Sequence, residues 1–180
     1  MSLSSNKHAR NILLSGGADN YCKVWDISKE SCLHTFSHHT DKVQCVSWHN
    51  TEPSIFMSGS YDKSISILDA RYPQSATTIN LGSEIECIQW NPHNPQHLFV
   101  SCEDGNVYCY DARNTNSGPL WTLNAHSKCV SAISCNNVIP NFLATGSIDK
   151  HFKLWDIEGN QPKLLGDTKA NVCTNLLINY

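Results

Sequence analysis

The sequence predicts an all-β protein assembled from four copies of one small antiparallel sheet. Residues 143–157 read LATGSIDKHFKLWDI, in which two short apolar runs flank a polar turn at residues 148–150. This pattern is typical of a β-hairpin. Near-copies of the segment begin at Leu13, Phe56 and Phe99. The repetition indicates that one structural unit is used four times along the chain.

The spacing of the copies predicts the kind of unit. A small hydroxyl residue follows the first apolar run of each copy, and it recurs after 43, 43 and 44 residues, as Ser15, Ser58, Ser101 and Thr145. A period in the low forties that closes on Trp-Asp is the signature of WD-type propeller blades, each a sheet of four antiparallel strands. The 180 residues hold about four such blades, whereas closed propellers have up to about eight. We therefore expect part of a WD-repeat β-propeller, an incomplete ring.

Both ends of the chain are expected to lie in mid-blade. Residues 1–5 stand where later copies carry a full first strand, and residues 171–179 resemble a first strand with no hairpin after it. The expected limits within this single propeller fragment are 1–37 for blade 1 with its first strand truncated, 38–82 for blade 2, 83–125 for blade 3, 126–169 for blade 4, and 170–180 for the first strand of a fifth blade.

The charge balance favours proteins as partners. The chain carries 13 basic and 16 acidic residues, a net charge of −3, which argues against an electrostatic grip on nucleic acid or an anionic membrane. The sequence contains no run of 18 apolar residues and begins with a polar segment, so no membrane span or signal peptide is expected. We expect a soluble intracellular protein with no cofactor, no small-molecule substrate and no sequence-specific nucleic acid binding.

The cysteines and histidines do not predict a disulfide framework or a metal site. The nine cysteines are an odd number without a CxxC pair, and Cys45 and Cys87 occupy the same position in two copies. Such positions suit small buried residues, so reduced core thiols are expected. Zinc usually takes pairs of ligands from two places, and no second pair accompanies either of two local clusters: His93 with His97, and Cys32, His34, His38 and His39.

One recurring set of residues resembles a catalytic triad. The fourth copy contains His126, Thr145, Asp149 and Trp155, and the second contains His39, Ser58 and Asp62 at matching offsets. In the enzymatic interpretation the hydroxyl is a nucleophile activated by histidine, but a triad repeated in several blades has no catalytic logic. In the structural interpretation the indole donates to the hydroxyl, the hydroxyl bonds the imidazole, and the imidazole faces the carboxylate, so that all the buried polar groups are satisfied. We favour the structural network, with no catalytic residue.

The set is incomplete elsewhere. The first copy offers Ser15, Asp19 and Trp25, without a histidine. The second copy has Leu68 in the tryptophan position, and the third copy has Ser83 for the histidine and Tyr110 for the tryptophan. We therefore expect a complete network only in the fourth blade.

Several stretches point beyond the generic repeat to one family. These stretches are HTDKVQ from His39, SGSYDKS from Ser58, EDGNVYCYDAR from Glu103, TLNAH from Thr122 and DKHFKLWDIEGNQP from Asp149. They resemble the periodic tryptophan protein family of eukaryotes, over residues 9–165. The resemblance implies a non-enzymatic WD-repeat scaffold in the nucleus and nucleolus, acting in ribosome biogenesis through processing of ribosomal RNA precursors and ribosomal DNA chromatin. Pre-ribosomal or chromatin-associated proteins are then the expected partners.

Two alternatives stay open. The Asp-Ala-Arg closings at residues 69–71 and 111–113 also resemble histone-binding and ribosomal-protein-chaperone WD-repeat proteins. An enzyme built on a propeller, a hydrolase, is the other alternative, and the sequence lacks an activated nucleophile or metal set to support it.

The loops on the side of the network are the expected binding rim. Propellers expose loops that rigid blades hold in fixed relation, and mixed charges with an exposed aromatic residue suit protein contact. The rim candidates are Asp41, Lys42, Tyr61, Lys63, Glu84, Glu103, Lys128, Ile148 and Lys150. Open blade faces at the two ends of the fragment also favour self-association.

Overall fold

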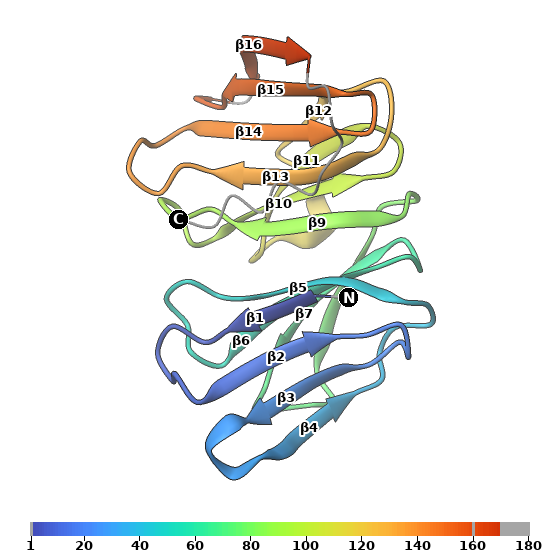
Figure 1. Cartoon of the computed structure of the whole chain (residues 1–180), viewed down its shortest axis with the longest axis vertical. Helices are drawn as coiled ribbons and strands as arrows, with labels where there is room; N and C mark the ends of the chain where they lie inside the picture. Colours follow the sequence, from blue (N-terminus) through green and yellow to red (C-terminus); the bar gives the residue numbers. More distant parts are fainter. Residues whose placement is uncertain (1, 160, 170–180) are drawn as a thin grey trace. The chain divides into compact units, whose positions relative to one another are not determined.

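The computed structural model describes residues 2–159 and 161–169, and it confirms the predicted all-β fold of four-stranded blades (Figure 1). The chain divides into two compact units, residues 1–88 and 89–180, which are described separately. In each sheet the strands follow one another in chain order and pair antiparallel. None of the helices in the described residues is long and apolar enough to cross a membrane.

The sheets have the following strands. The first contains β1 Ser2–Ser5, β2 Ile12–Gly16, β3 Cys22–Asp26 and β4 Ser31–Phe36; the second contains β5 Val43–Trp48, β6 Ile55–Ser60, β7 Ser64–Asp69 and β8 Ala76–Asn80. The third contains β9 Ile85–Trp90, β10 His97–Cys102, β11 Asn106–Asp111 and β12 Trp121–Asn124; the fourth contains β13 Val130–Cys135, β14 Phe142–Ser147, β15 His151–Asp156 and β16 Lys163–Lys169. Two short 3-10 helices, η1 Ile27–Lys29 and η2 Thr115–Ser117, lie in connecting loops.

The first strand of the first sheet is short but paired. Strand β1 has four residues, whereas β5, β9 and β13 have six each. It pairs with β2 in the register Ser2 with Gly16 through Ser5 with Leu13, so the first sheet has four strands in spite of the short segment. The strand expected at residues 171–179 lies outside the described residues.

The central hairpin of each blade turns in the same way. The residue after the turn aspartate has a positive φ in all four sheets: Asn20 at 68°, Lys63 at 70°, Gly105 at 89° and Lys150 at 71°. The aspartate carboxylate accepts the backbone N–H two residues later, as in Asp62 with Ser64 at 3.0 Å and Asp149 with His151 at 2.9 Å. This local bond is typical of an Asx turn, and it fixes the direction of the aspartate side chain.

The register corrects the alignment of the third copy. In the fourth sheet Thr145 pairs with Lys153, which lies two residues before Trp155. In the third sheet the residue that pairs two residues before Tyr110, with Tyr108, is Val100. Val100 therefore occupies the hydroxyl position, and Ser101 faces the opposite side of the sheet. The first strand β9 starts four residues after Leu81, as β5 starts four residues after His39, so Leu81 and not Ser83 holds the histidine position. The third copy therefore has apolar residues, Val100 and Leu81, in the hydroxyl and histidine positions.

Within the first unit, the second sheet packs on one face of the first. The buried residues Leu14, Cys22 and Val24 of the first sheet form one apolar cluster with residues of the second, among them Val43, Val46, Trp48, Phe56 and Leu68. A Cβ at Gly16 would lie 2.6 Å from Val43 Cγ1 and 2.8 Å from Val46 Cγ1. The close approach of the two sheets therefore requires glycine at this position.

The described cysteines form no disulfide with one another, and most of them are buried. Burial raises the pKa of Cys22 and of Cys109 to about 12, because an apolar environment disfavours the thiolate. These thiols act as small apolar core residues.

Candidate functional site

A chain of buried hydrogen bonds crosses the fourth sheet. Trp155 Nε1 donates to Thr145 Oγ1 at 2.9 Å, Thr145 Oγ1 lies 2.8 Å from His126 Nε2, and His126 Nδ1 lies 3.0 Å from Asp149 Oδ2. The His126 and Trp155 side chains come from the loop before β13 and from β15, whereas Thr145 lies on β14 and Asp149 in the β14–β15 turn. The bonds therefore tie four segments of one blade together.

With a neutral imidazole, the donors and acceptors in this chain have one consistent arrangement. A carboxylate accepts hydrogen bonds only, so His126 Nδ1 carries the proton and donates to Asp149. His126 Nε2 then accepts from the Thr145 hydroxyl, which in turn accepts from the indole of Trp155. Burial lowers the pKa of His126, against the opposing effect of Asp149. The imidazole is therefore held in the neutral form, with every polar atom of the chain satisfied.

The second sheet has the same arrangement around a serine. His39 Nδ1 lies 2.8 Å from Asp62 Oδ2, and His39 Nε2 lies 2.8 Å from Ser58 Oγ. The Ser64 hydroxyl donates to the other carboxylate oxygen of Asp62 at 2.6 Å. Burial lowers the pKa of His39. Leu68 stands in the tryptophan position, so no indole is there to donate to Ser58.

His38 fills the role of the missing indole, a role that the spacing of the repeat does not predict. His38 Nε2 lies 2.9 Å from Ser58 Oγ, and its ring centroid lies 4.3 Å from that of His39. Because the Ser58 hydroxyl donates to His39, His38 Nε2 is the donor in this contact. His38 Nδ1 is buried and has no hydrogen-bond partner in the described structure. Burial, together with the neighbouring His39, lowers the pKa of His38 to about 4.

The first and third sheets have only parts of this arrangement. Trp25 Nε1 donates to Ser15 Oγ at 2.9 Å, but Asp19 accepts instead from Lys23 Nζ at 2.7 Å, at the surface. In the third sheet Val100 offers no hydroxyl, and Asp104 accepts from Asn106 and Tyr108. The turn aspartate thus takes local partners where no histidine is placed to meet it.

The geometry argues against the enzymatic interpretation of these residues. The Ser58 and Thr145 side chains are 0 % and 1 % exposed, and their hydroxyls are already engaged on two sides by the network. A nucleophile must reach its substrate, and these oxygens are enclosed by protein. The arrangement is suited to holding loops in place.

The network fixes the backbone of the rim in both units. In the second sheet Asp62 accepts the Thr40 N–H at 3.0 Å, and the Ser60 hydroxyl donates to the Asp41 carbonyl at 3.0 Å. In the fourth sheet Asp149 accepts the Ser127 N–H at 3.3 Å, and the Ser147 hydroxyl donates to the Lys128 carbonyl at 3.2 Å. The loop before each of these blades is therefore bonded to the turn inside it.

The predicted rim side chains lie at the surface over this rigid base. Asp41, Lys42, Lys63, Glu103, Lys128, Ile148 and Lys150 are exposed, and Tyr61 and Glu84 are partly exposed. Lys42 Nζ lies 6.0 Å from the centre of the Tyr61 ring, within the range of a cation–π contact. Each unit carries its own part of the rim: residues 41, 42, 61, 63 and 84 in the first, and 103, 128, 148 and 150 in the second.

The local clusters of histidine and cysteine have structural partners. His93 Nε2 lies 2.9 Å from the Asn136 carbonyl, and the Cys32 thiol contacts the His34 carbonyl at 3.4 Å. Within residues 2–159 and 161–169, no group of three His, Cys, Asp or Glu side chains is arranged to hold a metal ion.

The network makes the stability of the protein depend on pH. Because burial depresses the pKa values of His38, His39 and His126 in the folded state, the unfolded chain binds more protons below pH 6.5. The free energy of unfolding is then highest above pH 6.5 and falls as the pH is lowered towards 4. We expect urea titrations to show a loss of about 1 kcal/mol or more between pH 7 and pH 5. His38→Gln should reduce this loss, and an unfolding free energy that is flat over this interval would contradict the buried neutral histidines.

Comparison with known proteins supports the same fold assignment. The family model "WD domain, G-beta repeat" matches residues 1–26, 30–69, 76–111 and 117–156. The E3 ubiquitin-protein ligase COP1 of Arabidopsis thaliana is 32% identical over 160 residues, 89% of this chain and 23% of that protein. Periodic tryptophan protein 1 of Saccharomyces cerevisiae is 31% identical over 162 residues, 86% of this chain and 28% of that protein.

A shorter match joins the chain to a third relative. The U3 small nucleolar RNA-associated protein 15 homolog of Xenopus laevis is 29% identical over 73 residues, 41% of this chain and 14% of that protein. The chain spans between 20% and 32% of the length of the first four curated relatives it matches.

Proposed function

The chain belongs to the WD-repeat family, and on this premise we propose that it is a non-enzymatic scaffold that binds proteins through its rim. WD-repeat domains mediate protein–protein interactions. The observation that supports this role is that the backbone of the rim loops is held by hydrogen bonds while the rim side chains are exposed. Backbone N–H groups of the rim loops donate to Asp62 and Asp149, and these bonds hold the loops, while charged side chains and Tyr61 lie at the surface beside them. A preorganised surface loses little conformational freedom when a partner binds.

We propose further that this scaffold acts in ribosome biogenesis, in the nucleus and nucleolus. Two observations support the proposal: the motifs that resemble the periodic tryptophan protein family, such as HTDKVQ from His39, and the similarity to a yeast protein of that name. The similarity to a relative named for association with U3 small nucleolar RNA points in the same direction. The partners proposed on this basis are pre-ribosomal or chromatin-associated proteins.

Affinity purification of the whole chain from nucleolar extract tests both proposals. The rim variant is Lys42→Glu combined with Lys63→Glu, which reverses two exposed charges on one unit. The control is Lys29→Glu, because Lys29 is 71% exposed and lies in η1 outside the rim. We expect pre-ribosomal proteins to co-purify with the unchanged chain and with the control, and to fall at least tenfold with the rim variant.

Other outcomes would overturn one part or the other. Pre-ribosomal proteins captured equally by all three chains would contradict the rim as the binding surface. Histones, or one ribosomal protein as the sole partner, would contradict the pre-ribosomal role and favour the histone-binding or chaperone alternative. In each of the Asp-Ala-Arg closings behind that alternative, the arginine forms an ion pair with the aspartate of the same motif: Arg71 with Asp69 and Arg113 with Asp111, both at 2.6 Å.

A further inference from the structure

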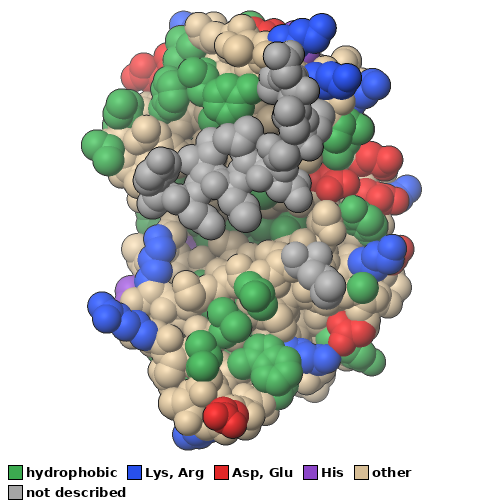
Figure 2. Space-filling view, viewed as in Figure 1, with side chains coloured by type: hydrophobic (Ala, Val, Ile, Leu, Met, Phe, Trp, Pro, Cys, Tyr) green, Lys and Arg blue, Asp and Glu red, His purple; other side chains and the backbone are tan. Residues whose placement is uncertain are grey.

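The edge of the second unit that lies opposite its rim exposes apolar side chains. Strands in each sheet are antiparallel and follow one another in chain order, so the β9–β10 and β13–β14 loops lie away from the β14–β15 turn. His93 of the first loop bonds the Asn136 carbonyl of the second at 2.9 Å. Val138 and Ile139 of the β13–β14 loop are 85% and 56% exposed, and Figure 2 shows hydrophobic side chains at the surface where β13 leads into β14, at the left of the view. Neighbouring exposed apolar side chains indicate a contact surface.

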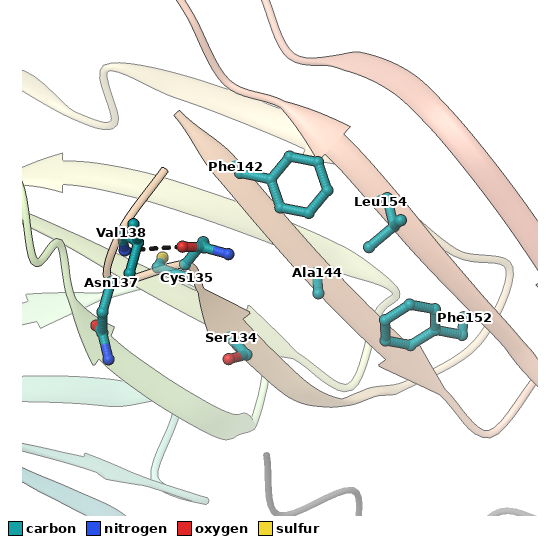
Figure 3. Close-up of a pocket in the computed structure, with 9 residues that line it drawn as sticks. Ser134, Cys135, Asn137, Val138, Phe142, Ala144, Phe152 and Leu154 are labelled. Atoms are coloured by element: carbon teal, nitrogen blue, oxygen red, sulfur yellow. Dashed lines mark hydrogen bonds between the residues drawn. The ribbon is translucent and has the colours of Figure 1, made fainter. Parts of the chain in front are cut away.

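One hollow that borders the β13–β14 loop has an apolar lining on the strands. It has a volume of about 460 Å³ and includes Phe142, Ala144, Phe152 and Leu154, which Figure 3 shows on the neighbouring strands β14 and β15. Side chains of this kind offer no hydrogen bond, so these strands do not distinguish one apolar ligand from another.

A second hollow, between the third and fourth sheets, has a mixed lining. Its volume is about 290 Å³, close to that of the smallest pockets that bind small ligands. The apolar part of the lining includes Trp121 and Ile157, and the polar side chains are those of Asn91, His93, Asn94, His97 and Asn141. Among the described residues that line the hollow there is no Lys, Arg, Asp or Glu. The lining therefore favours an uncharged ligand.

His97 is a departure from the repeat in this hollow. The residue that pairs with the aspartate at the end of the third strand is Ile12, Ile55 and Phe142 in the other sheets, and His97 in the third. In the first unit Ile12 packs against the apolar cluster between the sheets. The imidazole of the third sheet thus places polar atoms where the other sheets have only carbon.

Trp121 is a second departure. It pairs with Cys109 from the outer strand β12 and is buried. In the first and second sheets the equivalent outer-strand residues are His34 and Thr77, and both are exposed. The centre of the Trp121 ring lies 5.7 Å from that of the buried Phe99. The buried indole therefore gives the hollow an aromatic wall that the first and second sheets lack.

The hydrogen bonds around His97 determine which of its ring nitrogens can donate. Asn94 Oδ1 accepts the Gln96 N–H at 3.2 Å, so the Nδ2 end of this amide is the one that lies 3.2 Å from His97 Nε2. An amide nitrogen only donates, so His97 Nε2 accepts, and in the neutral ring the proton is on Nδ1. Within the described residues His97 Nδ1 has no hydrogen-bond partner. This donor is available to a ligand.

Two further donors belong to side chains of the lining. Asn91 Oδ1 accepts the N–H groups of His93 and Asn94 at 2.9 and 3.2 Å, and Nδ2 of Asn91 has no hydrogen-bond partner in the described part of the chain. Trp121 Nε1 also lacks one among the residues that the structure describes. A carbonyl or hydroxyl oxygen satisfies such donors, whereas another N–H does not. The hollow therefore favours a ligand group that accepts hydrogen bonds and carries no charge.

We propose that this hollow binds the side chain of a tyrosine of a partner protein, at a site separate from the rim. The phenol ring packs against Trp121 and Ile157, and its oxygen accepts from His97 Nδ1. Tyrosine combines an aromatic body with an uncharged polar tip. Phenylalanine lacks the acceptor, tryptophan has only a donor, and aspartate and glutamate bring a charge. The exposed Val138 and Ile139 contact the residues that flank the tyrosine, as surrounding side chains do for a central anchor.

Nuclear magnetic resonance titration of the whole chain tests the proposal, with N-acetyl-tyrosine amide as the probe. We expect a saturable shift of the Trp121 indole signal, with a dissociation constant on the order of 1 mM for a ligand of this size. N-acetyl-phenylalanine amide, which lacks the hydroxyl, should bind about fivefold more weakly. Equal affinities for the two probes, or a Trp121 signal that the tyrosine probe leaves unshifted, would overturn the proposal.

Two variants test whether the probe binds in the hollow. His97→Ile introduces the residue that Ile12 and Ile55 provide in other sheets, so it removes the donor and suits the fold, which circular dichroism checks. It should bind both probes weakly and equally, and a tyrosine preference that survives would refute the role of His97. The control Lys150→Glu changes an exposed rim residue of the same unit and should bind as the unchanged chain does. Loss of binding in this control would place the probe at the rim and so contradict the separate site.

A peptide separates a protein partner from a small molecule. The peptide Ala-Val-Tyr-Val-Ala, acetylated and amidated, should bind about tenfold more tightly than the tyrosine probe, because its valines contact Val138 and Ile139. Ile139→Asp should weaken the binding of the peptide and leave that of the tyrosine probe unchanged. A peptide that binds no better than the probe, or that loses nothing in Ile139→Asp, would contradict a protein partner.

Discussion

Replacement of Trp155 by alanine is expected to lower the free energy of unfolding by about 3–5 kcal/mol. The indole is 6% exposed, so its removal leaves a large cavity on the face of the fourth sheet. The Thr145 hydroxyl also loses its donor, which adds the cost of an incompletely satisfied buried group. Urea unfolding at pH 7, followed by circular dichroism, measures the change.

Two control variants separate the packing of Trp155 from its hydrogen bond. Trp155→Phe keeps most of the buried ring and removes the N–H, so we expect a loss of about 1 kcal/mol. Trp25→Ala, at the same position of the first sheet, removes an indole that is partly exposed and bonds a serine without a histidine; its cost should be well below that of Trp155→Ala. Equal losses in the two alanine variants would contradict the special role of the fourth network.

Replacement of Gly59 by valine is expected to cost about 3 kcal/mol. A Cβ at this position would lie 2.6 Å from Ile85 Cγ2 and 2.8 Å from Cys45 Sγ. Valine adds two further carbons in the same tight space, so the strands that meet at Gly59 must move apart. The same urea titration measures the loss.

Gly146 provides the matched control, because it holds the same position in the fourth sheet as Gly59 in the second. Among described residues, only Ala132 lies within 4 Å of a Cβ added there. Valine also favours extended strand conformation more than glycine does, so Gly146→Val should be neutral or slightly stabilising. A loss of the same size at both glycines would contradict the open space beside Gly146 among the described residues.

The fold could be predicted in detail because its signals are local. The sequence of each hairpin consists of two apolar runs around a turn aspartate, and the residue after the aspartate adopts a positive φ in every copy. The hairpin expected around the turn at residues 148–150 is present as β14 Phe142–Ser147 and β15 His151–Asp156. The pairing of Ser2–Ser5 could not be predicted in the same way, since this short segment has only one apolar residue and resembles no other first strand.

The site could be predicted only where the period of the repeat is regular. His126, Thr145 and Asp149 could be grouped from the sequence because they repeat the spacing of His39, Ser58 and Asp62. The role of His38 depends on how its loop approaches Ser58, which no spacing encodes. Asp19 forms an ion pair with Lys23 at the surface, and this local pairing is likewise not encoded in the spacing of the repeat. In the third copy Ser101 has the hydroxyl that the repeat predicts, but Val100 holds the equivalent position on the strand. The alternation of faces along the strand, and not the type of side chain, identifies the equivalent residue.

The networks of the second and fourth sheets depend on neutral histidines, each held by a hydroxyl on one side and a carboxylate on the other. Two-dimensional ¹H–¹⁵N spectra of the imidazole rings of His39 and His126, recorded as a function of pH, test this claim most directly. The structure predicts neutral rings protonated at Nδ1, with pKa values below the ordinary value of about 6.5. Rings protonated at Nε2, or rings that titrate at the ordinary pKa, would contradict it.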